Sequence, residues 1–329
     1  MDINYKILWF EDTDESYETL SRRTQRYVEG KNLRCQIKRI YGVADFDISQ
    51  YDLNAYEVLV VDLQLSQGSK GYEIINAIRA SNYVNDILFY SSAGVSTLEQ
   101  AMKEYRLEGV FLSDRDNRVF MEKIKQLIDK SVRRSENIIN IRGIVMDETS
   151  EFDSKMKDIT LAAQLLLSPD EIGFVKEYVS KNLLEKKVDD ASNLLKKFPE
   201  NGEWEISDLF EEHEFNSMMR ARLINKILGL ESNQQLQDLI KSCYDVLPEI
   251  FDSGSWKLQF VKAYDDNVIK FRNKLAHVKQ FNAKHPVLIG TINGTEYRCD
   301  AQFCTMMRDT LIRYGNWFDA VYDKLEKRS

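Results

Sequence analysis

The first 132 residues alternate between short apolar runs and longer amphipathic segments. We expect buried strands at the apolar runs KILWF (6–10), QIKRIY (36–41), VLVVDL (58–63), DILFYS (86–91) and GVFL (109–112). Helical periodicity separates them, in SYETLSRRTQRYV (16–28), YEIINAIRAS (72–81), TLEQAMKEYR (97–106) and VFMEKIKQLIDKSV (119–132). Strands that alternate with helices through short connections form parallel sheets with right-handed crossovers. The pattern therefore predicts an α/β domain over residues 1–132, with a doubly wound, parallel, five-stranded sheet.

The second half of the chain has a different pattern, made of long helical stretches. Residues 133–162 keep helical periodicity and contain little proline or glycine, so we expect a stiff helical connector there. Residues 163–329 predict an all-α domain with one small β-hairpin, VLIGTINGTEYRC (287–299), in which Asn293-Gly294 supplies the turn. Two domains joined by a helix could transmit a conformational change.

Composition narrows the class of protein. The net charge of −8 argues against indiscriminate binding to polyanions, although a local basic surface is compatible with it. Four cysteines show neither CxxC spacing nor a matching pair of histidines, so we expect no disulfide framework and no zinc site. The N-terminus does not resemble a signal peptide, and no apolar stretch could span a bilayer. We therefore expect a soluble, cytoplasmic protein without a membrane partner.

Carboxylates and hydroxyls stand where the predicted strands of the first domain end. Strand one ends in Glu11-Asp12, strand three at Asp62, strand four at Ser91 and strand five at Ser113. Ligands of a doubly wound sheet bind beyond the carboxyl ends of its strands. Three carboxylates brought together there repel one another unless a hard cation such as Mg²⁺ neutralises them. We therefore expect a Mg²⁺ site formed by Glu11, Asp12 and Asp62.

This domain resembles the receiver domains of two-component response regulators. The segments ILWFED, VVDLQLSQGSKGYEIINAIR and ILFYSSAG match the receiver pattern in order and spacing. The resemblance implies that Glu11 and Asp12 bind Mg²⁺ and that Asp62 accepts a phosphoryl group from a sensor histidine kinase or another phosphodonor. It also implies that Ser91 hydrogen-bonds the phosphoryl group. The added charge and acceptor oxygens can reorganise a nearby surface.

Two features depart from the receiver pattern. Receivers carry a lysine just after strand five, and Ser113 stands at that place in VFLSDRDN. Arg115, two residues further on, is a cation that could reach the phosphate instead. The loop after Asp62, LSQGSKG, lacks the usual proline and is one residue longer before Gly71. An alternative therefore stays open, namely a degenerate receiver that keeps the fold but no longer cycles phosphate.

An acid-free segment of the second half, NVIKFRNKLAHVKQFNAKH (267–285), gathers cations within an acidic chain. Besides five lysines and arginines, it contains two of the three histidines, His277 and His285. Histidine can exchange a proton near neutral pH, and arginine can stabilise a charged phosphorane. These are the two requirements of RNA cleavage without a metal, so the segment has the chemistry of a ribonuclease.

The string FRNKLAH resembles the R-(x)4-H motif of the HEPN superfamily, small all-α domains that include many metal-independent endoribonucleases. The matching residues are Arg272, Asn273 and His277. The resemblance implies that His277 is a general base or acid, that Arg272 stabilises the phosphorane and that Asn273 orients the reacting groups. A five-residue separation leaves Arg272 and His277 about 140° apart around an ideal helix. The family meets this constraint as a homodimer, so a homodimer that binds RNA is expected; the alternative is that His277 lies where the helix unwinds.

Two functions are compatible with these motifs. The first is a response-regulator-like protein in which a phosphorylatable receiver controls a HEPN-type, metal-independent endoribonuclease, an output that would suit stress response or phage defence. The second is a non-catalytic signalling adaptor, whose HEPN-like domain binds RNA, a nucleotide or a partner protein. In the second case Arg272 and His277 are packing or binding residues. A surface helix with solvated cations is the simplest alternative for RNKLAH.

Overall fold

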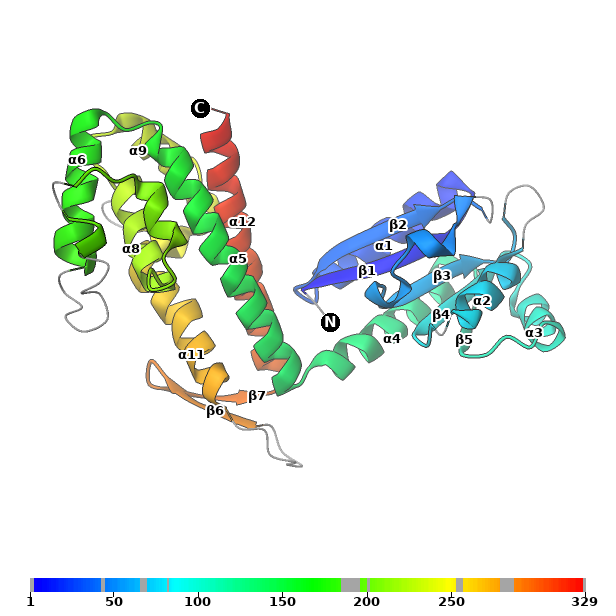
Figure 1. Cartoon of the computed structure of the whole chain (residues 1–329). Helices are drawn as coiled ribbons and strands as arrows, with labels where there is room; N and C mark the ends of the chain where they lie inside the picture. The colour runs from blue at the N-terminus through cyan, green and yellow to red at the C-terminus, as the bar shows by residue number, and fades with distance from the viewer. Residues whose placement is uncertain are drawn as a thin grey trace. The chain divides into compact units, whose positions relative to one another are not determined.

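The chain forms two compact units in a computed structural model (Figure 1). The structure describes residues 3–42, 45–65, 70–81, 83–184, 196–199, 202–252, 257–278 and 287–327. Unit 1 comprises Met1–Ile141 and Asp300–Asp309, and unit 2 comprises Arg142–Cys299 and Thr310–Ser329. The expected domain boundaries, after residues 132 and 162, both fall inside helices.

Unit 1 contains a five-stranded parallel sheet. Its strands are β1 (Asn4–Phe10), β2 (Arg34–Ile40), β3 (Val58–Asp62), β4 (Asp86–Ser91) and β5 (Val110–Asp114). The strands lie in the order β2-β1-β3-β4-β5, and every neighbouring pair is parallel. This is the strand order of flavodoxin-like folds, whose direction of winding switches between β1 and β3. The predicted doubly wound sheet is therefore confirmed.

Helices cover both faces of this sheet (Figure 1). They are α1 (Asp14–Glu29), α2 (Gly71–Ala80), α3 (Val95–Glu104) and α4 (Asn117–Ser135). Because successive side chains of a strand point to opposite faces, β1 supplies both cores. Ile7 and Trp9 pack with side chains of α1 and α4, whereas Leu8 and Phe10 pack with those of α2 and α3. Burial on both faces explains why the strands read as continuous apolar runs.

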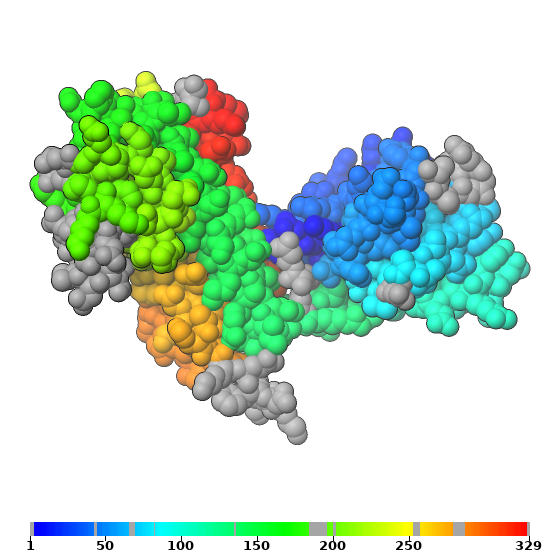
Figure 2. Space-filling model, in the orientation of Figure 1, coloured from blue at the N-terminus to red at the C-terminus, as the bar shows by residue number. Residues whose placement is uncertain are grey.

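Unit 2 is mostly helical. Its helices are α6 (Pro169–Tyr178), α8 (Ser217–Leu228), α9 (Gln234–Lys241), α10 (Phe260–Tyr264) and α11 (Lys270–His277). Two longer helices, α5 (Ile138–Gln164) and α12 (Ala301–Glu326), have residues in both units. Side chains of α5, α6 and α8 make up much of the face of unit 2 that Figure 2 shows. None of the described helices is both long enough and apolar enough to span a membrane.

Shorter helical turns connect these elements. In unit 1 they are the 3-10 turns Ile48–Gln50 and Leu53–Ala55. In unit 2 they are the 3-10 turns Ile206–Glu211, Tyr244–Val246 and Pro248–Ile250, and the π-helical turns Val179–Leu184 and Asp265–Ile269. The second π-helical turn runs directly into α11, so the basic segment begins at an irregular piece of helix.

Aromatic side chains fill the core of unit 2. The Phe260 ring of α10 stacks on Trp317 of α12 at a centroid separation of 5.1 Å, and on Tyr264 at 5.2 Å. Phe152 of α5 meets Phe318 at 5.2 Å. Aromatic side chains bury a large apolar area each and contribute much of a core's stability. Three helices that are distant in sequence are therefore held together at the centre of this unit.

The hairpin lies where the sequence predicts it. The antiparallel pair β6 (Val287–Ile292) and β7 (Thr295–Cys299) is joined by Asn293-Gly294. Both turn residues have positive φ, 50° and 84°. A two-residue turn with positive φ at both positions matches the twist of antiparallel strands, which is why Asn-Gly is favoured there.

The expected connector, 133–162, is helical on both sides of one break. Helix α4 ends at Ser135 and α5 begins at Ile138, where Asn137 Oδ1 accepts hydrogen bonds from two backbone N–H groups, each at 3.1 Å. Such a cap satisfies donors that the first helical turn leaves free. Glu136, in the break, forms an ion pair with Arg308 at 3.3 Å. The break therefore lies within unit 1, where Arg308 contacts it.

Candidate functional site

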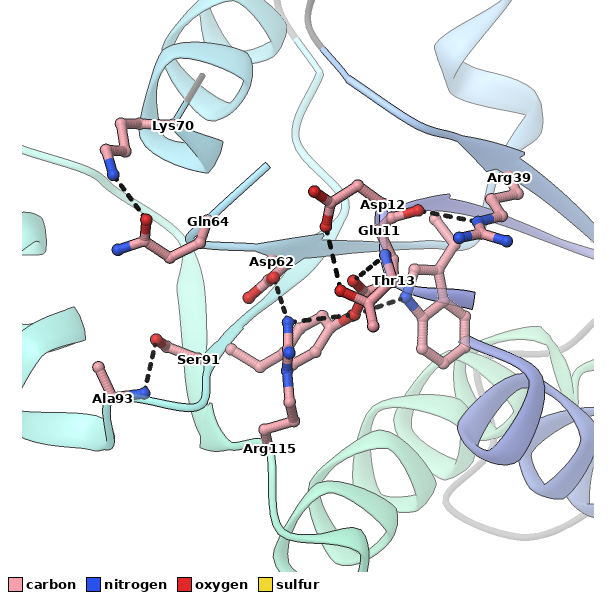
Figure 3. Close-up of polar contacts among 12 residues, drawn as sticks. Glu11, Asp12, Thr13, Arg39, Asp62, Gln64, Lys70, Ser91, Ala93 and Arg115 are labelled. Atoms are coloured by element: carbon pink, nitrogen blue, oxygen red, sulfur yellow. Dashed lines mark hydrogen bonds and ion pairs between the residues drawn. The ribbon is translucent and has the colours of Figure 1, made fainter. Parts of the chain in front are cut away.

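Three carboxylates meet at the carboxyl edge of the sheet in unit 1 (Figure 3). Glu11 follows β1 and Asp62 ends β3; because these strands are parallel neighbours, their ends meet. Glu11, Asp12 and Asp62 each offer an oxygen, and these oxygens lie within 4.8 Å of one another. Glu11 and Asp62 are buried, with exposed fractions of 0% and 1%. The structure thus brings together all three residues that the sequence proposes as metal ligands.

Arg115 is the cation of this cluster. Its guanidinium forms an ion pair with Asp62 Oδ2 and lies 3.3 Å from Glu11 Oε2 (Figure 3). The residue directly follows β5, and its backbone N–H donates to the carbonyl of Ser91 at 3.0 Å. Ser113, which stands where receivers carry lysine, donates its hydroxyl to the backbone carbonyl of Asp114 at 2.8 Å. Arg115, rather than the residue at the lysine position, therefore supplies the positive charge.

Besides Arg115, two further donors hold Glu11 in place. Its Oε1 accepts the backbone N–H of Thr13 at 2.8 Å, and its Oε2 accepts the hydroxyl of Tyr90 at 2.6 Å. The Tyr90 oxygen in turn accepts the indole N–H of Trp9 at 3.0 Å. Sequence reasoning missed Tyr90 and Trp9, which looked like plain core residues. The available signal was that a buried tyrosine or tryptophan needs a polar partner, and Tyr90 stands directly before Ser91.

Asp62 is the buried carboxylate that has one oxygen in an ion pair and the other without a partner among the described residues. Burial raises the pKa of its carboxyl group to about 7; the charge of Arg115 and the backbone N–H groups of Gln64 and Leu63 oppose this rise, and the charge of Glu11 adds to it. Its Oδ1 is buried and has no hydrogen-bond partner among the described residues. A buried acceptor without a partner is costly, so such an atom indicates a place for a ligand. Carboxylate oxygens are the donors that Mg²⁺ prefers, and this donor set fits that ion.

Ser91 ends β4 beside Asp62, at the place expected of a phosphate contact. Its side chain is buried, and its hydroxyl accepts the backbone N–H of Ala93 at 3.1 Å (Figure 3). The hydroxyl proton is free to turn toward another acceptor, since a serine hydroxyl both donates and accepts. Ser91 is thus near the carboxylates without being bonded to them in this structure.

Gly71 shapes the other side of the site, where α2 begins. Its N–H donates to the carbonyl of Leu63 at 3.0 Å, and a Cβ atom at this position would lie 2.1 Å from the backbone oxygen of Asp62. Only glycine allows so close an approach. Residues 66–69 of the longer loop LSQGSKG lie outside the described residues; on either side of them, Lys70 Nζ donates to Gln64 Oε1 at 2.7 Å.

The RNKLAH segment lines a pocket in unit 2. The pocket has a volume of about 610 Å³ and lies between α11 and the hairpin. Its lining residues are Lys270, Asn273, Lys274, His277, Thr291, Ile292 and Asn293. Asn273 and His277 share it because residues four apart lie on one face of a helix. Lys270 Nζ donates to Asn293 Oδ1 at 2.8 Å and so connects the helix to the hairpin turn.

Arg272, the third residue of the motif, does not line this pocket. Its Nε is buried and has no hydrogen-bond partner among the described residues. Its charge acts on Asp153 of α5, where it opposes the rise in carboxyl pKa that burial causes. Within one chain, therefore, Asn273 and His277 line the pocket, while Arg272 does not line it and its charge acts on the half-buried carboxylate of Asp153. The wide angle that the sequence predicts between Arg272 and His277 agrees with this separation.

The acid-free segment is less isolated from acids in space than in sequence. Lys270 forms an ion pair with Asp266 and lies 3.7 Å from Asp265, both in the preceding π-helical turn. The local positive charge is therefore smaller than the sequence suggests. His285 lies outside the described residues, and His213 is an exposed residue 3.1 Å from the carboxylate of Glu214.

The known proteins that resemble this chain are solved structures that match its N-terminal part. No family model and no curated protein matches it. Among solved structures, the BeF3-activated DrrB receiver domain is 16% identical, with 39% of this chain and 99% of that chain covered and a TM-score of 0.31. The receiver domain of a DNA-binding response regulator (merR) from Colwellia psychrerythraea 34H is 19% identical, with 38% and 98% covered and a TM-score of 0.30. The fold assignment itself rests on the strand order and pairing described above.

Proposed function

We propose that this chain is a signalling protein whose unit 1 is a phosphoryl-accepting switch. Asp62 is the acceptor, and a sensor histidine kinase or a small acyl phosphate is the donor. Glu11, Asp12 and Asp62 hold the Mg²⁺ ion, which when bound offsets negative charge on the carboxylates and the incoming phosphoryl group. The observation that carries the proposal is the buried, unpartnered Oδ1 of Asp62 within this cluster.

The surrounding residues suit that reaction. A carboxylate oxygen of Asp62 attacks the phosphorus, an oxygen–phosphorus bond forms, and the donor's bond to phosphorus breaks. The nucleophile must be ionised, and in the metal-free site the charge of Arg115 beside Asp62 favours the charged form. Ser91, at the end of the neighbouring strand, has a hydroxyl that can donate to a phosphoryl oxygen.

The acceptor can be tested by intact-protein mass spectrometry after incubation with acetyl phosphate and Mg²⁺. We expect the wild-type chain to gain the mass of one phosphoryl group and Asp62→Asn to gain none. Asp158→Asn, which changes an exposed carboxylate of α5, is the matched control and should behave as wild type. An Asp62→Asn protein that is phosphorylated as fully as wild type would show that another residue is the acceptor.

For unit 2 we propose a metal-independent endoribonuclease output of the HEPN type. The supporting observations are the mostly helical surroundings and the pocket shared by Asn273, His277 and two lysines. His277 is exposed and can exchange a proton with the ribose 2′-hydroxyl or the leaving oxygen. Because Arg272 does not line the same pocket, the proposal requires a homodimer in which the partner copy completes the site.

Cleavage can be tested by incubating the protein with RNA in EDTA. We expect wild type to cut the RNA and His277→Ala to lose at least about a hundredfold in rate, the usual share of a general acid or base. His213→Ala, an exposed histidine outside the pocket, serves as the control and should retain the rate. Equal cleavage by wild type and His277→Ala would contradict the assignment.

The alternative output is a non-catalytic adaptor, and the position of Arg272 favours it. The Nε of Arg272 is buried and its charge acts on Asp153, which is what a structural role of this arginine requires. In that case the pocket binds RNA or a nucleotide without cutting it. Binding can be measured by the fluorescence anisotropy of a labelled RNA. An RNA that binds wild type, binds Lys274→Ala more weakly and is not cleaved by either protein would favour the adaptor.

A further inference from the structure

Arg115 occupies the position in the acidic cluster that a bound cation would need. Its guanidinium pairs with both buried carboxylates, Glu11 and Asp62, and its side chain is only 22% exposed. Among the described residues, it is the one lysine or arginine that forms an ion pair with either carboxylate. The two charges that most need compensation in the interior are therefore already compensated by the chain itself.

A metal ion and this guanidinium would compete for the same two carboxylates. The oxygens that Arg115 contacts, Glu11 Oε2 and Asp62 Oδ2, belong to the carboxylates that form the metal cluster. Two cations within a few ångströms of each other repel, the more strongly because the site is buried. An arginine is also a stronger competitor than a lysine, because its guanidinium is always charged, less hydrated and able to contact two carboxylates at once.

We propose that Arg115 is a resident cation that competes with Mg²⁺ for Glu11 and Asp62, so that metal binding requires its side chain to leave the cluster. This inference rests on the metal site of the proposed function. The resting site is then charge-compensated without Mg²⁺, and metal affinity is lowered by the free energy needed to displace the arginine.

The surroundings allow the side chain to move while its backbone stays in place. The backbone N–H of Arg115 is bonded to Ser91, and the next residue, Asp116, caps α4 by accepting from the N–H groups of Arg118 and Val119 at 3.0 and 3.1 Å. The side chain itself is incompletely bonded, because its Nε is buried without a partner among the described residues. Displacement therefore breaks the two ion pairs but leaves the start of α4 intact.

The competition can be measured by isothermal titration of the full-length protein with Mg²⁺. We expect Arg115→Ala to bind Mg²⁺ at least about tenfold more tightly than wild type. Arg118→Ala, an exposed arginine of α4 outside the cluster, is the matched control and should leave the affinity unchanged. Equal or weaker binding by Arg115→Ala would overturn the competition while leaving the metal site in place. Absence of Mg²⁺ binding in both wild type and Arg115→Ala would overturn the metal site as well.

A second measurement uses the unchanged protein, because Arg115→Ala leaves two buried carboxylates unpaired and could fold poorly. Phenylglyoxal modifies accessible arginines, and peptide mass spectrometry reports the extent at each one. We expect saturating Mg²⁺ to increase modification of Arg115 several-fold and to leave that of Arg118 unchanged. Mg²⁺ binding seen by titration with no change at Arg115 would show that metal and arginine occupy the cluster together.

Discussion

The acidic site of unit 1 and the basic pocket of unit 2 are built in opposite ways. The first gathers residues from far apart in sequence, at the ends of strands β1, β3 and β5, and buries them. In the second, α11 supplies Lys270, Asn273, Lys274 and His277, all within eight residues, and these side chains remain accessible from the pocket. In the acidic site the tertiary structure completes the constellation, because Arg115 joins Glu11 and Asp62. In the basic pocket the motif stays divided within one chain, because helix geometry turns Arg272 away from the pocket that His277 lines.

The difference shows which residues come together when a site lies at the ends of neighbouring strands, and which come together when it lies on one helix. Parallel strands in a doubly wound sheet must end at a common edge, so residues placed there meet whatever their side chains are. A helix instead distributes neighbouring residues around its axis, so a short motif holds its members together only at spacings of three or four. The acidic site should therefore depend strongly on backbone geometry, and the basic pocket should not.

The largest predicted effect tests that dependence at Gly71. In Gly71→Ala the new Cβ meets the backbone oxygen of Asp62 at 2.1 Å, so β3 and α2 must separate. We expect the free energy of unfolding of unit 1 to fall by about 3 kcal/mol and Mg²⁺ binding to weaken with it. Chemical denaturation followed by circular dichroism measures the free energy of unfolding.

Gly143→Ala is the matched control for this prediction. Gly143 lies within α5, where an added Cβ meets nothing within 4 Å. Alanine is the better helix former there, so we expect a gain in stability of about 1 kcal/mol. If the two substitutions destabilised the protein equally, the close approach at Gly71 would not be a special requirement of the acidic site.

A smaller effect is expected at Tyr90, which positions Glu11. Tyr90→Phe keeps the ring but removes the 2.6 Å hydrogen bond to Glu11 Oε2, and it also removes the acceptor of the Trp9 N–H. Hydrogen bonds to charged groups contribute more than neutral ones, so we expect a loss of about 2 kcal/mol in denaturation. Tyr322→Phe, on the exposed side of α12, should change stability little. A neutral Tyr90→Phe would mean that Arg115 and the backbone N–H of Thr13 hold Glu11 without the tyrosine.

The smallest effect concerns the pH dependence contributed by Asp153, the carboxylate near Arg272. Burial raises its pKa, while a hydrogen bond from Ser217 and the charges of Arg220 and Arg272 oppose the rise. Since the folded state then holds the proton more tightly than the unfolded state, this carboxyl lowers the free energy of unfolding as pH rises above about 4. We expect Asp153→Asn to make that decline shallower, as measured by urea denaturation across pH.

Two further variants connect this pH profile to the motif. Arg272→Gln removes an opposing charge, so the decline with pH should become steeper than in wild type. Asp158→Asn, on the exposed side of the same helix, should leave the profile unchanged. A profile that Arg272→Gln does not alter would argue against a structural role for Arg272 and would strengthen the catalytic assignment.

The sequence by itself determined the elements of this protein. Apolar runs marked the five strands because both faces of the sheet are covered, and Asn293-Gly294 marked the hairpin because that turn needs two residues with positive φ. Glu11, Asp12 and Asp62 could be grouped in advance, since strand order alone brings their strands' ends together.

Only the tertiary structure decided which side chains reach those residues. Arg115 enters the cluster because it directly follows β5, two residues beyond Ser113, where a lysine would stand, and the hydroxyl of Tyr90 on β4 reaches Glu11 across the intervening strand β3. The charge of Arg272 acts on Asp153 of α5, a residue distant from it in sequence, which the motif alone could not indicate. Periodicity describes a face of one element, whereas these contacts depend on how far side chains extend between elements that are distant in sequence.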